Sequence, residues 1–460
     1  MHKVTVNGKT EYAPHGTLLS DILNKSGKGV EHLCGGKGIC RKCTVTVDGK
    51  SELSCRYKIE SDITVCFDEK GEILSETGAH QSGTVTDNVC YALDIGTTTL
   101  ALALVSLDEK KIIKAVTRTN PQIKYGADVI TRIEYCTKNG VDSLQRAVIT
   151  EINTMIKQLG ICAEKMYVSG NTTMLHLFFG VDCSAMGVAP YTPSFLGSRT
   201  EKAKALGIES VETVESLPMV DAFVGADIVA GLGLVALPEK GRHSLLVDLG
   251  TNAEIVLFDD ESALCTSAAA GPCFEGANIS CGMSATDGAV YAYTCGRTKT
   301  VGNAPAKGIC GTGLIDIIAH FVGNGTVDET GFMENQCIEI AENVSINQED
   351  IRQYQLAKSA VYSAIVTLLK IKQVDLSDIE TLYISGGFSA KVNVANAALT
   401  GLLPKELTDK CTALNNSSLL GTVKYAAENN HLFKNRITYV DLSANPDFSD
   451  LFIENMMFDH

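Results

Sequence analysis

The first part of the chain alternates apolar and polar side chains over short stretches, a pattern that predicts β-strands. Residues 4–6 alternate in this way, and Asn7-Gly8 is the signal of a type I′ hairpin turn. Apolar side chains then recur at helical spacing over residues 18–23, and further strands are predicted at 44–47 and 63–65. The pattern therefore predicts a small domain in which short strands accompany one helix.

The apolar periodicity disappears between residues 67 and 89, where Glu, Gly, Ser, Thr and Asp accumulate. This composition is typical of a flexible linker. Beyond it, residues 91–105 predict two strands joined by a tight turn, with Asp94 just before a Gly-Thr-Thr sequence. A second copy occupies residues 245–256, with Asp248 before Gly-Thr-Asn. Two copies of one pattern indicate an internal duplication, as in a two-lobed domain.

Both copies place an acidic residue before a glycine turn rich in polar side chains. Glycine lets the backbone approach a phosphate, N–H and hydroxyl groups bind its oxygens, and the aspartate holds Mg2+, usually through water. We therefore predict Asp94 and Asp248 as catalytic residues that hold the metal ion. The predicted nucleotide-binding residues of the two turns are Gly96, Thr97, Thr98, Gly250, Thr251 and Asn252.

The paired turns resemble the phosphate-1 and phosphate-2 loops of the actin, sugar kinase and Hsp70 superfamily. Other stretches follow that superfamily's order: residues 168–173 resemble its first connecting segment, and residues 419–423 its second connecting helix. Residues 382–388 resemble its adenosine loop, which implies that Gly386 and Gly387 contact the nucleotide.

Two further features leave their role open. A glycine-rich sequence at 308–313 precedes apolar residues at helical spacing, so Gly311 and Gly313 either contact a nucleotide at a helix N-terminus or permit tight packing. Glu254 and Glu275 are candidate catalytic residues that position the attacking water, or carboxylates at the interface of the two lobes.

Four cysteines near the N-terminus, Cys34, Cys40, Cys43 and Cys55, are spaced as C-x5-C-x2-C followed by x11-C. Four thiolates in such an arrangement are the ligands of a [2Fe–2S] cluster, and the intervening glycines let the loop turn tightly around it. A structural zinc site is the alternative, but it usually has two C-x2-C-like pairs, and only one is present. The pattern favours a cluster in a β-grasp domain.

Composition narrows the class of protein. The net charge of −15 argues against a nucleic-acid partner, since a basic patch is the expected footprint of one. The longest apolar run is too short to span a bilayer, so we expect no membrane partner. Sixteen cysteines without a signal peptide indicate the reducing cytoplasm.

These observations predict an α+β/α/β multidomain chain. An N-terminal β-grasp [2Fe–2S] ferredoxin-like domain is followed by a two-lobed actin-like (ribonuclease H-like) ATPase domain. The expected boundaries are the ferredoxin-like domain at 1–66, a linker at 67–89, lobe I at 90–245, lobe II at 246–440 and a C-terminal tail at 441–460.

The combination of domains resembles the reductive activators of corrinoid enzymes. Several stretches are similar to that family: residues 119–122, 125–130, 170–176, 189–191, 224–227, 281–283 and 308–316. The resemblance covers nearly the whole chain. The family's longer members have an additional middle domain, which we expect to be missing here.

The resemblance implies an ATP-hydrolysing activator that transfers an electron from its [2Fe–2S] cluster to the Co(II) corrinoid of a methyltransferase partner and so restores Co(I). It implies ATP, Mg2+ and an upstream low-potential electron donor, and it leaves a homodimer open. Three alternatives remain. They are an ATP-coupled donor to another enzyme such as a 2-hydroxyacyl-CoA dehydratase, a nucleotide- and redox-dependent sensor, and a small-molecule kinase with Asp227 as base.

Overall fold

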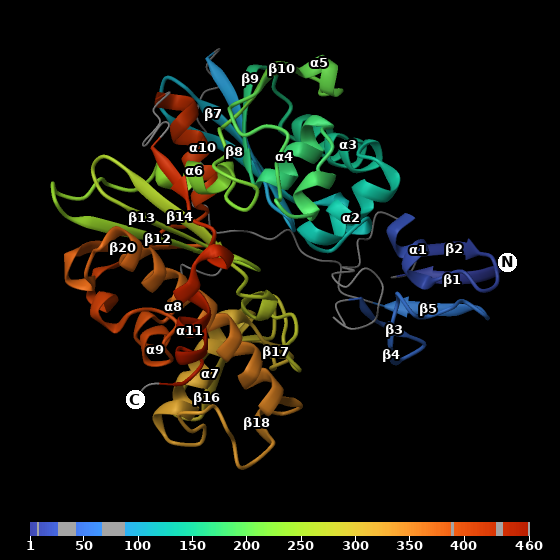
Figure 1. Ribbon diagram of the computed structural model, residues 1–460. Helices are drawn as coiled ribbons and strands as arrows, with labels where there is room; N and C mark the ends of the chain where they lie inside the picture. Colours follow the sequence, from blue (N-terminus) through green and yellow to red (C-terminus); the bar gives the residue numbers. More distant parts are fainter. Residues whose placement is uncertain (7–8, 26–42, 67–87, 388–390, 429–435, 459–460) are drawn as a thin grey trace. The chain divides into compact units, whose positions relative to one another are not determined.

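Figure 1 shows a computed structural model of the chain, which describes residues 1–6, 9–25, 43–66, 88–387, 391–428 and 436–458. These residues divide into two compact units, 1–217 and 218–460. The predicted boundary between the lobes, at residue 245, lies downstream of this division. Within the described parts of the chain, no helix has the length and apolarity needed to cross a membrane.

The first unit begins with a five-stranded sheet in the order β2-β1-β5-β3-β4, in which β1 and β5 are parallel. Its elements are β1 (His2–Val6), β2 (Lys9–Ala13), α1 (Leu19–Lys25), β3 (Thr44–Val47), β4 (Lys50–Leu53) and β5 (Ile63–Cys66). The alternation seen in the sequence sets the inner face, because Val4 and Val6 are buried between exposed or half-buried neighbours. This arrangement confirms the predicted β-grasp domain.

The second sheet of the first unit has six strands in the order β10-β11-β9-β6-β7-β8. The strands are β6 (Val89–Ile95), β7 (Thr99–Ser106), β8 (Lys111–Thr119), β9 (Ala163–Gly170), β10 (Thr200–Lys202) and β11 (Val211–Ser216). The accompanying helices are α2 (Val129–Asn139), α3 (Asp142–Leu159), α4 (Thr172–Phe179) and α5 (Ala203–Leu206). Helix α3 packs against β7 and β8 through its apolar face.

The main sheet of the second unit has the order β21-β20-β12-β13-β14-β22. Its strands are β12 (His243–Leu249), β13 (Ala253–Phe258), β14 (Ala263–Ala268), β20 (Ile379–Ser385), β21 (Cys411–Ala413) and β22 (Ile437–Tyr439). Two smaller sheets contain β15 (Ala289–Thr294), β16 (Arg297–Thr300), β17 (Gly308–Ile309), β18 (Cys337–Ala341) and β19 (Val344–Asn347). The helices are α6 (Ala226–Leu232), α7 (Gly311–Gly323), α8 (Gln348–Lys372), α9 (Val394–Leu399), α10 (Ser417–Glu428) and α11 (Pro446–Glu454).

The two large sheets repeat one arrangement. In each, an antiparallel hairpin (β6–β7 or β12–β13) continues into a third antiparallel strand on one side and a parallel strand on the other. The orders β11-β9-β6-β7-β8 and β21-β20-β12-β13-β14 therefore correspond strand for strand. A long helix covers the antiparallel side of each sheet, α3 in the first unit and α8 in the second. This correspondence confirms the predicted duplication.

Helices α6 and α10 pack closely against each other in the second unit. A side chain at Gly421 of α10 would place its Cβ only 1.9 Å from the carbonyl oxygen of Ala230 in α6, so glycine is required for this approach. The apolar residues of α6 join one buried cluster with Leu246 and Val256 of the sheet. The predicted second connecting helix thus lies in α10. Its packing partner α6 was not predicted as a helix, although the sequence analysis quoted residues 224–227 at its start.

The C-terminal residues pack onto α8. Ser359 Oγ donates to the carbonyl oxygen of Phe452, Gln355 Nε2 to that of Met456 at 2.7 Å, and Lys358 Nζ to that of Met457. The ring of Phe458 is buried and stacks on Tyr354 at 6.4 Å. Residues 452–458 therefore complete the core of the second unit.

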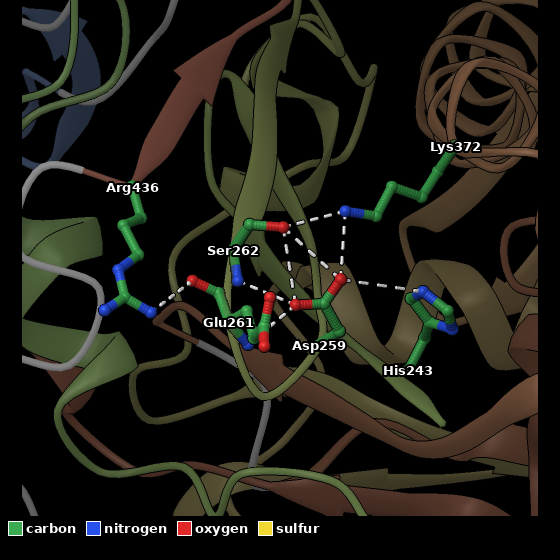
Figure 2. A network of polar contacts seen from close by, with 6 residues as sticks. All are labelled: His243, Asp259, Glu261, Ser262, Lys372 and Arg436. Carbon is green, nitrogen blue, oxygen red and sulfur yellow. Dashed lines mark hydrogen bonds and ion pairs between the residues drawn. The ribbon is translucent and has the colours of Figure 1, made fainter. Parts of the chain in front are cut away.

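A polar network at the far end of the β13–β14 hairpin ties four elements together (Figure 2). Asp259 accepts hydrogen bonds from the backbone N–H groups of Glu261 and Ser262, and Lys372 Nζ lies 2.9 Å from its carboxylate. His243 Nε2 of β12 is 3.9 Å from the same carboxylate, and Arg436 donates to the carbonyl oxygen of Glu261. The network anchors the end of α8 to the sheet.

Candidate nucleotide and cluster sites

Two of the four predicted cluster ligands lie in the described part of the chain. Cys43 directly precedes β3 and Cys55 follows β4, and both side chains are buried. The backbone N–H of Ser54 donates to the carbonyl oxygen of Cys43 at 2.9 Å, so the pairing of β3 with β4 brings the two cysteines to one end of the sheet. Cys34 and Cys40 lie outside the described residues.

Ser54 supplies an observation that fits a cluster at this end of the sheet. Its hydroxyl is fully buried, and within the described ranges its Oγ has no hydrogen-bond partner. A buried hydroxyl without a partner destabilises the fold, whereas a neighbouring cluster sulfur is an acceptor for it. Two adjacent thiols and a free donor are therefore consistent with the predicted ligand set.

The first turn, residues 96–98, follows Asp94 at the end of β6. The backbone N–H of Gly96 donates to the carbonyl oxygen of Thr99 at 2.9 Å, which closes the turn. Three residues from other segments bind the turn: Asn120 Nδ2 donates to Gly96 O at 2.8 Å, Arg132 Nη2 to Thr97 O at 2.6 Å, and Asn171 Nδ2 to Thr97 Oγ1 at 3.1 Å. The backbone N–H of Asn120 also donates to Thr98 O at 2.8 Å.

Three of the stretches that resemble the activator family contribute or lead to the residues that bind the first turn. Residues 119–122 provide Asn120, residues 125–130 lead into α2 with Arg132, and residues 170–176 provide Asn171. Asn171 is also the N-cap of α4, because its side chain accepts from the backbone N–H of Met174. Segments far apart in sequence thus converge on the first turn.

The second turn, residues 250–252, follows Asp248 at the end of β12. Ser385 of the parallel strand β20 donates to Asp248 Oδ2 at 2.5 Å, and Ser417 at the start of α10 does so at 3.5 Å. Burial raises the pKa of the Asp248 carboxyl, and the two serine hydroxyls oppose that shift. Asp94 has the equivalent register partner Ser169 on β9. The duplication therefore extends to an aspartate–serine pair at the end of each hairpin.

Glu254 lies on the same face of the sheet as Asp248, because the two residues are cross-strand partners. Burial raises the pKa of Glu254 well above its ordinary value, and the carboxylates of Asp227 and Asp248 raise it further. Ser267 donates to Glu254 at 3.1 Å. Asp227, at the first turn of α6, is thereby placed near Glu254.

Glu275 is placed differently from Glu254. Its side chain is exposed and accepts a hydrogen bond from Thr251 Oγ1 at 2.8 Å, so it contacts the second turn directly. The described residues contain no group of three or more His, Cys, Asp or Glu side chains arranged to hold a metal ion. A magnesium ion bound through water, as the sequence predicts, needs fewer direct ligands.

The predicted glycines mostly serve close packing. A Cβ at Gly311 or Gly313 would lie 2.1 Å from the carbonyl oxygen of Phe274 or Val290, and one at Gly386 would lie 2.1 Å from that of Leu249. Gly386 also has a positive φ of 108°, a region that favours glycine. Gly387 has open space around it. Contact of these four residues with a nucleotide stays a prediction.

Sequence reasoning missed several residues at the two turns: Asn120, Arg132, Asn171, Ser385 and Ser417. Asn120, Asn171 and Ser385 stand inside stretches that the sequence analysis quoted, which was the available signal. Arg132 and Ser417 had no such signal, because their contacts join segments distant in sequence.

Comparisons with known proteins agree with this geometry. A family model described as the 2Fe-2S iron-sulfur cluster binding domain matches residues 4–74. A model described as the RACo middle region matches residues 89–240, and one described as the C-terminal domain of RACo, the ASKHA domain, matches residues 242–460. A solved structure titled reductive activator for corrinoid, iron-sulfur protein superposes with a TM-score of 0.71 at 25% identity, covering 100% of this chain and 99% of that one.

The chain belongs to the family of reductive activators of corrinoid proteins. Among curated relatives of this activator chain, the corrinoid activation enzyme RamQ of Eubacterium limosum is 29% identical over 80% of the chain and 70% of its own length. The [Co(II) methylated amine-specific corrinoid protein] reductase of Methanosarcina barkeri is 27% identical over 68% of the chain and 65% of its own length.

One expectation about the activator chain is wrong. A segment that matches the family's middle region is present at residues 89–240, where the sequence analysis expected a missing middle domain. The error arose because the segment forms the six-stranded sheet with the first turn, so its strands had been assigned to the actin-like part. The comparisons do not favour the kinase, dehydratase-donor or sensor alternatives.

Proposed function

We propose that this chain is an ATP-dependent reductive activator that gives one electron to the Co(II) corrinoid of a methyltransferase partner and restores Co(I). The observation that carries the proposal is the union in one chain of a ferredoxin-type match at 4–74 with an ASKHA match at 242–460. An electron carrier joined to a nucleotide-binding domain has an evident use where an electron must move against its potential gradient.

Cys34, Cys40, Cys43 and Cys55 hold the cluster in this proposal. A [2Fe–2S] cluster supplies one electron at a time, at potentials near roughly −400 mV in plant-type ferredoxins. Each tenfold change in a one-electron equilibrium corresponds to about 59 mV, so a Co(II)/Co(I) couple modestly more negative than the cluster leaves little Co(I) at equilibrium. The chain's own contribution is burial of Cys43 and Cys55, which limits contact with water. An upstream low-potential donor must then reduce the cluster again.

The two turns bind the nucleotide in this proposal. Asp94 and Asp248 orient Mg2+ through water, and the turns at 96–98 and 250–252 bind the phosphates with backbone N–H groups and hydroxyls. Energy is transferred only if two conformations of the activator differ in their affinity for nucleotide and for the corrinoid protein. Glu254 and Glu275, one beside Asp248 and the other bonded to Thr251, are the candidates that position the attacking water.

The proposal is tested under anaerobic conditions with the full chain. The cluster is reduced chemically, a Co(II) corrinoid protein is added, and the Co(II) electron paramagnetic resonance signal is followed with and without MgATP. We expect the signal to disappear only when MgATP is present. Persistence of Co(II) beside a reduced, intact cluster, with every available corrinoid partner, would overturn the proposal.

A further inference from the structure

The first turn presents three consecutive carbonyl groups to donors from elsewhere in the unit. Gly96 O accepts from Asn120 Nδ2 at 2.8 Å, Thr97 O from Arg132 Nη2 at 2.6 Å, and Thr98 O from the backbone N–H of Asn120 at 2.8 Å. Consecutive carbonyls that all have protein donors fix the orientation of three successive peptide planes.

The orientation of the carbonyls determines that of the N–H groups. The peptide bonds of the turn are trans, and in a planar trans peptide the C=O and the following N–H point in opposite directions. Fixing the carbonyls of residues 96–98 toward Asn120 and Arg132 therefore directs the N–H groups of residues 97–99 to the other side. A run of backbone N–H groups with one orientation is an anion-binding arrangement.

Arg132 is held rigidly for this role. Its side chain is fully buried, and Nε donates to Gly126 O at 2.9 Å while Nη1 lies 3.0 Å from Met174 Sδ and 3.4 Å from Gln122 Oε1. Asp128 caps α2 through the backbone N–H of Thr131, which fixes the helix turn that carries Arg132. Burial lowers the pKa of Arg132 to about 10, and Asp128 opposes that shift, so the guanidinium is charged at neutral pH.

We propose that Arg132 is a positioning residue for nucleotide binding, which orients the Thr97–Thr98 peptide so that its N–H faces the phosphates of ATP. Its planar fork binds the carbonyls of Thr97 and Gly126 together and so fixes the turn against the start of α2. The inference rests on the proposed function, because it assigns the first turn to the phosphates. It adds a buried cation that acts through the backbone and does not touch the nucleotide.

The test measures MgADP affinity of the full chain by calorimetry for the natural protein, Arg132→Lys and Arg132→Met. We expect Arg132→Met to weaken binding by at least about tenfold, the order that one hydrogen bond to a charged group contributes. Arg132→Lys keeps the charge but has no planar fork, so its affinity should fall between the other two. The absorption spectrum of the cluster should be unchanged in both variants.

A control separates positioning from general loss of stability. Ile152 is fully buried in the same unit on α3, the helix that packs against β7 and β8, so Ile152→Ala should lower the melting temperature and leave MgADP affinity unchanged. If Arg132→Met does not fold, the MgADP affinity of Arg132→Lys tests the inference by itself. Natural affinity in Arg132→Lys and in any folded Arg132→Met would overturn the inference, as would an equal loss in Ile152→Ala. Absence of binding by the natural chain would instead contradict the proposed function.

Discussion

Asp248 and Glu254 face each other across the β12–β13 hairpin, as cross-strand partners on the sheet face that contacts α6. Like charges directly opposite each other destabilise a sheet, and burial adds to the penalty. The pKa of each carboxyl is raised, that of Glu254 strongly. Repulsion between the two carboxylates therefore destabilises the hairpin, and a bound proton or cation reduces that repulsion.

Replacing Glu254 by Gln should remove a pH dependence of stability. The folded pKa of Glu254 lies above the ordinary value of 4.5, so its stabilising effect is complete below pH 4.5 and is lost as pH rises through the folded pKa. Glu254→Gln imitates the protonated form, and its free energy of unfolding should decline less over that rise than that of the natural chain. Urea denaturation at a series of pH values measures both curves.

The control for this experiment is Glu342→Gln, which changes an exposed carboxylate of the same unit. It should reproduce the natural curve. A curve for Glu254→Gln that runs parallel to the natural one would show that folding does not shift the pKa of Glu254.

Asp94→Asn and Asp248→Asn should each abolish ATP-dependent Co(II) reduction and leave the cluster spectrum unchanged. The amide removes the charge that orients Mg2+, and loss of an electrostatic group at a reaction centre lowers rates by about 10²–10³. Steady-state reduction with the reduced chain measures the effect. Glu164→Gln, at an exposed position of β9, should retain full activity. Natural rates in both asparagine variants would exclude these acids from the mechanism.

Asp259→Asn should destabilise the second unit by about 1–2 kcal/mol, because the partly buried ion pair with Lys372 in Figure 2 is broken. Burial alone would raise the pKa of Asp259, but Lys372 and two backbone N–H groups lower it to about 2 from 3.8. The stabilisation is therefore present above pH 3.8 and is lost as pH falls toward 2. Asp260→Asn, at an exposed neighbour, should have little effect on chemical denaturation. Equal stability of the two variants would contradict the assigned role.

Ser54→Ala should lower the reduction potential of the cluster. A hydroxyl that donates to a cluster sulfur stabilises the more negative, reduced state, and one hydrogen bond of about 1 kcal/mol corresponds to a few tens of millivolts. Redox titration followed by absorption measures the shift, with the exposed Ser61→Ala as control. An unchanged potential in Ser54→Ala would mean that the buried hydroxyl does not donate to the cluster.

The repeated pattern at Asp94 and Asp248 predicted the duplicated sheet arrangement correctly, because the alternation of apolar residues and the turn chemistry are both local. The cysteine spacing predicted the ferredoxin-type domain for the same reason. Local patterns did not reveal that residues 89–240 match a distinct family region, since strands of one sheet look alike in sequence.

The polar contacts around the turns were less predictable. Arg132 reaches Thr97 across 35 residues and Ser385 reaches Asp248 across 137. Such contacts depend on how helices and strands assemble, which a single sequence does not encode in its spacing. The sequence offered Glu254 and Glu275 equally as candidates for positioning the attacking water, and only the fold places one beside Asp248 and the other on Thr251.

The packing of residues 452–458 on α8 has a consequence for synthesis of the protein. Gln355 and Lys358 find acceptors in the carbonyls of Met456 and Met457, about a hundred residues later in the chain. During translation, α8 leaves the ribosome before residues 452–458, so the face of α8 that they cover is exposed to solvent until that segment emerges. The second unit therefore completes its core only after residues 452–458 are made, so a chaperone that shields α8 would assist the chain until that segment has been synthesised.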